Sequence, residues 1–252
     1  MREVLLKTEQ LSKSFSNGGV LQHVLKNIDL ELYEGDFTVI MGASGAGKST
    51  LLYALSGMDT PTLGTITFHG QVISDMSPDA LAVFRRRHCG FVFQQIYLLD
   101  GMSIMDNVLA AGLLVSQEKK ALVGRAEELF KAVGISQEIQ KKFPPQLSGG
   151  EAQRAGIVRA LINAPEILFA DEPTGMLNSK TGLEVLDTLT RCNGRGQSIV
   201  MVTHDMRSAR RGNRILYLKD GAILGECHLG AYVHNDQERH RKLAGFLEEM
   251  GW

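Results

Sequence analysis

Gly42-Ala43-Ser44-Gly45-Ala46-Gly47-Lys48-Ser49-Thr50 matches the phosphate-binding loop pattern G-x-x-x-x-G-K-[ST] at every position. The β-branched and apolar run at residues 37–41 precedes this loop and predicts a buried strand. Apolar residues follow at helical spacing up to Gly57 and predict a helix that ends there. An ordinary glycine turn is the alternative, but the order strand, glycine loop, helix favours a nucleotide site.

The loop has the chemistry of an anion site. Its glycines tolerate positive φ and have no Cβ, so the backbone can approach a phosphate closely. The amides then point inward at the positive end of a helix dipole. We expect Lys48 to reach the β- and γ-phosphates and the Ser49 hydroxyl to coordinate Mg²⁺. The expected nucleotide contacts in this loop are Gly42, Ser44, Gly45, Ala46, Gly47, Lys48, Ser49 and Thr50.

Composition narrows the class of protein. The chain has 252 residues, 44% of them hydrophobic and 22% charged, as in a soluble globular domain with a sizeable core. A net charge of −1 argues against a nucleic-acid partner. Cys89, Cys192 and Cys227 lie far apart, which argues against a zinc ribbon or a disulfide framework and fits a reducing cytosol. We expect no signal peptide and no spanning helix, so work on a membrane would require a partner that spans it.

The pattern along the chain predicts an α/β fold with a parallel core sheet, because two apolar runs, 167–170 and 198–202, read as strands covered on both faces. An alternating stretch at 28–33 predicts a strand. We expect the strand-rich first third of the chain to include an N-terminal antiparallel β subdomain. The whole chain, 1–252, is expected to form a single domain. Its expected parts are an ATP-binding core with the β subdomain at about 1–95 and 161–225, a helical lobe at about 96–160, and a C-terminal helical tail at 226–252.

Two carboxylates follow the first of these runs directly. Charge at the end of a buried strand is costly without a partner, and a phosphate site supplies one. We expect Asp171 to hold Mg²⁺ and Glu172 to polarise the water that attacks the γ-phosphate. His204 follows the second run and is expected to act at the same sheet edge, whereas the other six histidines are interpreted as structural.

A second serine-glycine turn lies at residues 147–154, Leu-Ser-Gly-Gly-Glu-Ala-Gln-Arg. Ser148 with Glu151 three residues later is a capping box, so a plain helix cap is the simplest interpretation. Free amides, a hydroxyl and a helix N-terminus also make a weak anion site, which lacks a lysine.

In this order, the motifs resemble those of ATP-binding cassette (ABC) ATPases, which are P-loop NTPases. The resemblance covers about residues 3–225. It implies that Phe15 stacks on adenine, that Gln94 senses Mg²⁺ and the γ-phosphate, and that His204 is the switch histidine. It further implies a head-to-tail homodimer in which each ATP lies between one phosphate loop and the partner's signature. The signature residues are Ser148, Gly149, Gly150 and Glu151.

The resemblance also assigns roles by chemistry. The catalytic set it implies is Glu172, His204, Gln94 and Lys48, and the Mg²⁺ set is Ser49, Gln94 and Asp171. One departure stands out, because the family usually has aspartate where this chain has Asn178. Asparagine keeps the size but loses the charge, so we expect altered coupling between subunits and a lower basal ATPase rate.

Details at residues 42–45, 90–100 and 169–175 resemble cassettes that pair with FtsX-like permeases, a group that includes lipoprotein release, macrolide export and peptide-antibiotic resistance or sensing. The ending Leu98-Leu99-Asp100 and the terminal Met250-Gly251-Trp252 favour the peptide-antibiotic branch. The implied permease contact is a groove near Ile96, Tyr97 and Leu98, on the cytoplasmic face of the cell membrane.

Other ATPase classes are alternatives to this transporter motor. A soluble ABC ATPase that acts as a scaffold or assembly factor also has a single cassette, as in iron–sulfur cluster assembly. Translation factors of the family usually carry two cassettes, and its DNA-repair members insert a long coiled coil that this chain lacks. A P-loop kinase has no use for the turn at residues 147–154.

Overall fold

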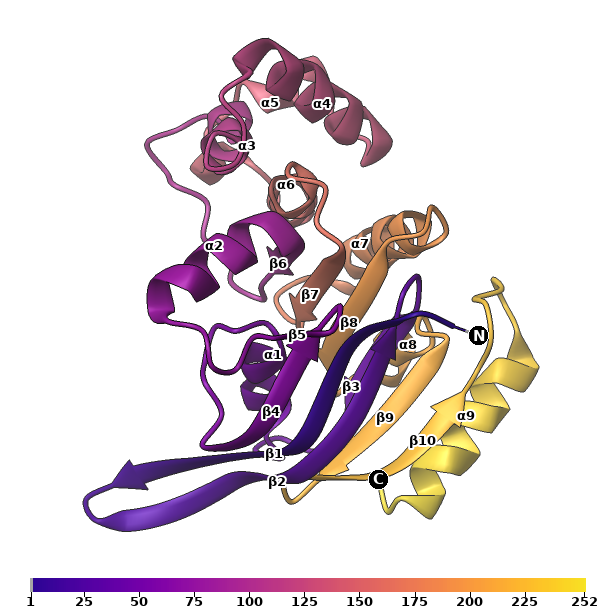
Figure 1. Cartoon of the computed structure of the whole chain (residues 1–252). Coiled ribbons are helices and arrows are strands. Elements are labelled where there is room, and N and C mark those ends of the chain that lie inside the picture. Colours follow the sequence, from indigo (N-terminus) through magenta and orange to yellow (C-terminus); the bar gives the residue numbers. More distant parts are fainter. Residues whose placement is uncertain (1) are drawn as a thin grey trace. The chain divides into compact units, whose positions relative to one another are not determined.

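The computed structural model describes residues 2–252 and divides into two compact units. The first unit contains the chain up to Ala82 together with Arg195–Trp252, and the second contains Val83–Gly194. Figure 1 shows the strands and helices that make up each unit. The two units are separated by how the chain packs. The division into an ATP-binding core, a helical lobe and a C-terminal tail, which the sequence analysis expects, remains a prediction.

In the first unit, four strands run in the order β10-β9-β3-β8. They are β3 (Phe37–Met41), β8 (Ser198–Thr203), β9 (Arg214–Lys219) and β10 (Ala222–His228). Strand β3 pairs in parallel with both β8 and β9, and every residue of β3 and β8 is buried. The continuous apolar runs therefore mark strands covered on both faces, as the sequence predicted.

An antiparallel sheet with the order β2-β1-β4-β5 completes the strands of this unit. They are β1 (Val4–Asn17), β2 (Val20–Tyr33), β4 (Leu63–Phe68) and β5 (Gln71–Val72). In β2, Ile28, Leu30 and Leu32 are buried and Asp29 is exposed, which is the alternation of a sheet with one covered face. The antiparallel β subdomain predicted from the sequence is therefore present.

The helices of the first unit are short, apart from the last. They are α1 (Lys48–Leu55), α8 (Met206–Ala209) and α9 (Gln237–Glu249). Leu243 and Leu247 of α9 are buried. A Cβ added to Gly225 of β10 would lie 2.8 Å from Met250 Sδ and 3.2 Å from Phe246 Cε2. The apolar side chains of α9 therefore pack on the first unit. Helix α2 (Pro78–His88) crosses the boundary between the units.

The second unit combines two parallel strands with a group of helices. The strands are β6 (Cys89–Val92) and β7 (Ile167–Asp171), which pair with each other. The helices are α3 (Ile104–Gly112), α4 (Lys119–Ala132), α5 (Gln137–Gln140), η1 (Pro144–Gln146), α6 (Gly149–Leu161) and α7 (Ser179–Asn193). Ile104, Val108, Phe130 and Val158 belong to a core that α3, α4 and α6 share, which confirms a helical lobe in this part of the chain.

Across residues 2–252, none of the helices combines the length and the apolar character that crossing a bilayer requires.

Candidate functional site

The phosphate loop connects β3 to α1 in the first unit. Gly47 is the N-cap residue of α1, with φ 100°, and as a glycine it supplies no side-chain cap to this helix end. The first turn carries no acidic residue. Lys48 is buried, and its Nζ donates hydrogen bonds to the carbonyl oxygens of Gly42 and Ala43, each at 2.9 Å. A glycine N-cap and a cation folded over the loop fit a phosphate group.

Close packing explains why glycine is required in this loop. A Cβ on Gly42 would collide with the carbonyl oxygen of Leu218 in β9, and a Cβ on Gly47 would lie 3.0 Å from the carbonyl oxygen of Val24 in β2. The loop is therefore held between the two sheets of the first unit, and a side chain at either position would displace its backbone.

His204 directly follows β8, at the same edge of the sheet as the phosphate loop. Strands β3 and β8 are parallel, with Met41 opposite Thr203, so the residues that follow each strand emerge side by side. Asp205 caps α8 by accepting hydrogen bonds from the amides of Arg207 and Ser208, at 3.2 and 3.0 Å. Burial alone would raise the pKa of Asp205, but these bonds and one from the Ser208 hydroxyl lower it. The segment after His204 is thus fixed by an ionised cap.

Phe15 lies on β1, where it is opposite Gln22 of β2. Gln22 is two residues before Val24, which lies beside Gly47 of the phosphate loop. The Phe15 ring is 44% exposed, and Lys13 Nζ lies 4.9 Å from its centroid. An exposed aromatic ring on the strand pair next to the loop has the chemistry to stack on a nucleotide base.

The second unit carries the predicted carboxylates and Gln94 at one edge. Strands β6 and β7 are parallel, with Val92 opposite Ala170, so Gln94 lies just after the carboxyl end of β6 and Asp171 is the last residue of the paired strand β7. Gln94 lies against the turn after the carboxylates, because a Cβ on Gly175 would be 2.7 Å from Gln94 Nε2. Glu172 adopts φ 43°, a left-handed conformation that costs a non-glycine residue about 1–2 kcal/mol. Such conformations gather at functional sites.

The serine-glycine turn begins α6 as the capping box that the sequence predicted. The Ser148 hydroxyl accepts from the Glu151 amide at 3.3 Å, and Glu151 Oε2 accepts from the Ser148 amide at 2.7 Å. Hydrogen bonds from the Ser148 hydroxyl and amide lower the pKa of Glu151. Gly150 is buried against α7, since a Cβ there would lie 2.5 Å from Thr181 Cγ2. Asn178 caps α7 and accepts from the amide and hydroxyl of Thr181, at 3.0 and 2.6 Å.

The sequence analysis missed polar residues that hold the segment after β6. Gln153 and Arg159, both on α6, donate hydrogen bonds to backbone carbonyls of that segment. The one feature that could have pointed to them is a polar side chain within a helix whose other residues are mostly buried.

Several other histidines have structural partners. His88 Nδ1 lies 2.6 Å from Glu166 Oε1, and His228 Nε2 lies 2.6 Å from Glu226 Oε1. His69 Nε2 is 3.6 Å from Glu34 Oε1, and Glu3 completes an exposed group of metal-ligand type. Each of these three histidines thus lies beside a carboxylate, as in the structural interpretation.

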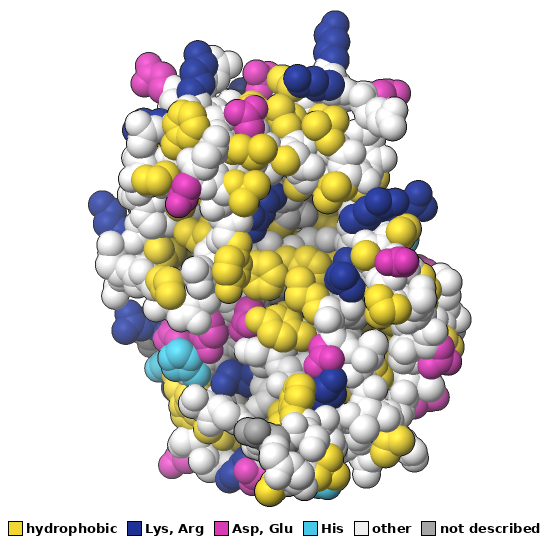
Figure 2. Space-filling view, turned by 90° about the vertical axis from the view of Figure 1, so that its left-hand side faces the viewer, with side chains coloured by type: hydrophobic (Ala, Val, Ile, Leu, Met, Phe, Trp, Pro, Cys, Tyr) yellow, Lys and Arg dark blue, Asp and Glu magenta, His cyan; other side chains and the backbone are white. Residues whose placement is uncertain are grey.

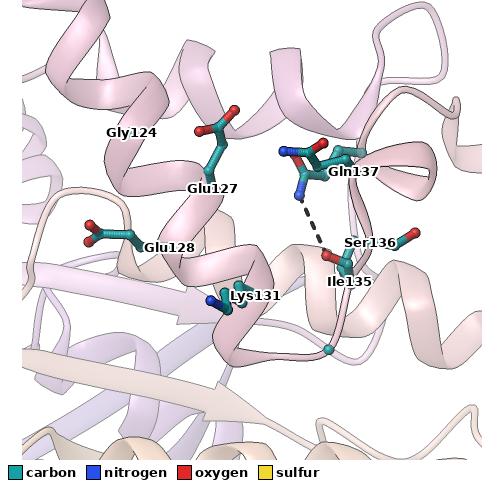
Figure 3. A pocket seen from close by; sticks show the side chains of 9 residues that line it. Gly124, Glu127, Glu128, Lys131, Ile135, Ser136 and Gln137 are labelled. Carbon is teal, nitrogen blue, oxygen red and sulfur yellow. Dashed lines mark hydrogen bonds between the residues drawn. The ribbon is translucent and has the colours of Figure 1, made fainter.

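A hollow of about 700 Å³ lies beside α4 and α5 in the second unit. Figure 3 shows Glu127, Glu128 and Lys131 around it. Gln140, which also lines the hollow, donates a hydrogen bond of 3.5 Å from Nε2 to the Ile135 carbonyl. Its lining is mixed in charge and contains none of the predicted site residues.

Comparison with known proteins identifies the family. The ABC transporter family model matches residues 25–175, more than half of the chain. The chain belongs to the ABC transporter family. It is 43% identical over 226 residues to the macrolide export ATP-binding/permease protein MacB 1 of Aeromonas hydrophila, covering 90% of this chain and 35% of that protein. It is also 41% identical to the uncharacterized ABC transporter ATP-binding protein MJ1508 of Methanocaldococcus jannaschii, covering 87% and 98% of the two chains.

Solved structures agree with this assignment. A dimeric post-hydrolysis state of the ATP-binding cassette MJ0796, bound to ADP and Pi, superposes with a TM-score of 0.82 and 38% identity, covering 90% of this chain and 100% of that one. The ABC cassette fold expected from the motifs is therefore confirmed, and the chain is an ABC-type ATPase. It spans about a third of the length of the MacB proteins it matches and nearly all of MJ1508.

Proposed function

We propose that this ABC cassette is the ATP-hydrolysing motor subunit of a membrane transporter and drives an FtsX-like permease. The proposed substrate is an antimicrobial peptide, a drug or a lipid-linked molecule. The transporter would export this substrate or give the cell resistance to it. The α1 N-terminus, with Lys48 folded over the loop that precedes it, carries the nucleotide part of this proposal. Similarity to MacB proteins, whose names join an ATP-binding part to a permease, supports the transport part.

In the proposed reaction, the amides of the loop and Lys48 bind the β- and γ-phosphates and orient the terminal phosphate. Mg²⁺, held by Ser49, Gln94 and Asp171, would neutralise charge on the phosphate oxygens. Glu172 accepts a hydrogen bond from the attacking water and aligns it, and His204 donates a hydrogen bond toward the γ-phosphate. The products are ADP and inorganic phosphate.

Closure of two cassettes would complete each site. Ser148 and the α6 amides form an anion site without a lysine, so alone this site should bind phosphate weakly. We propose that it acts on the ATP of a partner cassette in a head-to-tail dimer. The dimeric MJ0796 cassettes support this arrangement.

The segment after Gln94 is the proposed permease contact. It presents Tyr97, Leu99 and Met102, whose side chains are exposed. Figure 2 shows that hydrophobic side chains reach the surface in several places. Exposed apolar side chains close together in the sequence, as in this segment, are typical of a surface that meets a partner. This contact would hold the cassette on the cytoplasmic face of the membrane.

Purification of the tagged protein from its native membrane, with mass spectrometry of what accompanies it, tests the proposal. We expect an FtsX-like permease with the unchanged protein and with Val233→Asp, a matched substitution at a 59% exposed apolar residue. Tyr97→Asp should release the permease while ATP binding persists. A soluble complex without a membrane protein would contradict the motor and favour the scaffold ATPase.

A further inference from the structure

The segment at residues 93–103, here named the Gln94 segment, has no helix or strand of its own, yet it is firmly held. Gln153 of α6 is buried and its Nε2 donates a hydrogen bond of 3.0 Å to the Phe93 carbonyl. Arg159, further along α6, donates to the carbonyls of Ile96 and Tyr97, at 2.8 and 2.5 Å. Two side chains of α6 therefore hydrogen-bond to the backbone of the first half of the segment.

The far end of the Gln94 segment is anchored separately. Asn107 of α3 is 4% exposed and uses its whole amide. Its Oδ1 accepts from the Leu99 amide at 2.7 Å, and its Nδ2 donates to the carbonyls of Leu99, Met102 and Ser103 at 3.0–3.2 Å. Among the described residues, Arg159 thus supplies the side-chain hydrogen bonds to the carbonyls of Ile96 and Tyr97, which lie between the two anchored parts of the segment.

Backbone strain makes this stretch dependent on an outside partner. Tyr97 adopts φ 51°, a left-handed conformation that a side chain with a Cβ disfavours. Its ring is 61% exposed and meets the Phe93 ring edge-on at 5.6 Å, so little burial holds it. Charge-assisted hydrogen bonds from a guanidinium are among the stronger ones, and here they fall on the strained residue and its neighbour.

Helix α6 connects these hydrogen bonds to the signature turn at its N-terminus. It begins after the Ser148 cap and runs through Gln153 to Leu161, with Arg159 in its last turn. Gly156 lies close to the segment, because a Cβ there would be 3.1 Å from Ile96 Cγ2. A helix of this length moves as a rigid body, so a displacement of its signature end reaches its other end.

We propose that Arg159 is a positioning residue that fixes Ile96 and Tyr97 to the signature helix, so that nucleotide-driven movement of the signature reaches the surface offered to the permease. This inference rests on the proposed function and deepens it. It assigns Arg159 no contact with nucleotide: its role is to keep the Gln94 segment and α6 moving together.

Arg125 provides a matched control. It lies on α4 in the same unit, and its guanidinium also donates to two backbone carbonyls, those of Ile162 and Leu161, at 2.7 and 3.0 Å. Replacing Arg125 therefore removes the same kind of interaction without touching the Gln94 segment. A loss of stability alone would affect both variants alike.

Hydrogen exchange of the full chain, with and without a non-hydrolysable ATP analogue and Mg²⁺, tests the inference. In the unchanged protein and in Arg125→Ala, nucleotide should slow exchange in peptides covering both the phosphate loop and residues 94–103. In Arg159→Ala, exchange at residues 96–98 should rise about tenfold, with no response to nucleotide, while the loop still responds. Arg159→Lys, which keeps the charge but not the fork, should be intermediate.

The outcomes separate the two proposals. If nucleotide does not protect the phosphate loop of the unchanged protein, the proposed function fails. If the loop is protected and residues 94–103 respond equally in Arg159→Ala and the unchanged protein, the role of Arg159 is refuted and the motor proposal stands.

Discussion

Gly150→Ala should destabilise the protein through a single contact in the second unit. The added Cβ would lie 2.5 Å from Thr181 Cγ2 and 3.3 Å from Thr181 Cβ. Carbon atoms in good contact are about 3.5–4.0 Å apart, so the first distance is short by roughly 1 Å. Overpacking of this kind costs about 1–3 kcal/mol. The better helix propensity of alanine offsets about 1 kcal/mol, which leaves a net loss of up to about 2 kcal/mol.

A second substitution isolates that contact. Thr181→Ser removes Cγ2 but keeps the hydroxyl that donates to Asn178 Oδ1 at 2.6 Å. In the double variant, most of the lost stability should return, which gives a coupling free energy of about 1 kcal/mol in a double-mutant cycle. Gly124→Ala is the control, because a Cβ there meets nothing within 4 Å in the middle of α4. That change should stabilise by about 0.5–1 kcal/mol.

Thermal unfolding followed by circular dichroism measures these effects. For a chain of this length, each kcal/mol corresponds to a shift in Tm of about 2–4 °C. Gly150→Ala should lower Tm, the double variant should restore it, and Gly124→Ala should raise it slightly. An unchanged Tm for Gly150→Ala, or a Thr181→Ser background that rescues nothing, would refute the close packing of signature and α7.

Three further predictions concern binding, coupling and pH. Lys48→Ala removes the cation that folds over the loop, so affinity for MgATP in calorimetry should fall by about 10–100-fold. Asn178→Asp keeps the cap on Thr181 and adds a charge at the α7 N-terminus, so turnover in the assembled complex should rise. The hydrogen bond from Arg214 lowers the pKa of Glu226, so its contribution to stability is present above the unfolded pKa of about 4.3 and disappears as pH falls below it. Glu226→Gln should therefore flatten the fall of the urea midpoint between about pH 5 and pH 3.

Each of these tests has its own contrary result. Retained affinity in Lys48→Ala would remove this lysine from the phosphate site, and equal turnover in Asn178→Asp would remove the proposed coupling effect. If Glu226→Gln loses as much stability in acid as the unchanged protein does, the Arg214–Glu226 pair is not the source. Glu128→Gln, at an exposed position on α4, is the control for a change of net charge.

Short-range patterns predicted much of this fold. All five residues of β3 and all six of β8 are buried, and the glycine loop turns into α1 where the pattern places it. The Ser148–Glu151 capping box also formed as expected. These features depend on residues within a few positions of one another, which is why they can be recognised in one sequence.

Long-range contacts to the backbone could not be predicted in the same way. Arg159 donates to carbonyls that lie 62 and 63 residues away in the sequence. Every residue type has a backbone carbonyl, so the sequence does not indicate which residue accepts these bonds. The left-handed conformation of Glu172 and the fit of Gly150 against Thr181 likewise depend on packing of separate segments. Asn178 stood out from the sequence as a departure from the family, but its capping of α7 required the structure.

The most direct test of the motor is the mass of Glu172→Gln in solution. This substitution keeps the side-chain size and removes the carboxylate proposed to align water, so hydrolysis should fall by about 10²–10⁴-fold while ATP still binds. Light scattering should then show a stable dimer with MgATP and the 27.6 kDa monomer with MgADP. A protein that binds MgATP yet stays monomeric, or that hydrolyses ATP at the unchanged rate, would contradict the account.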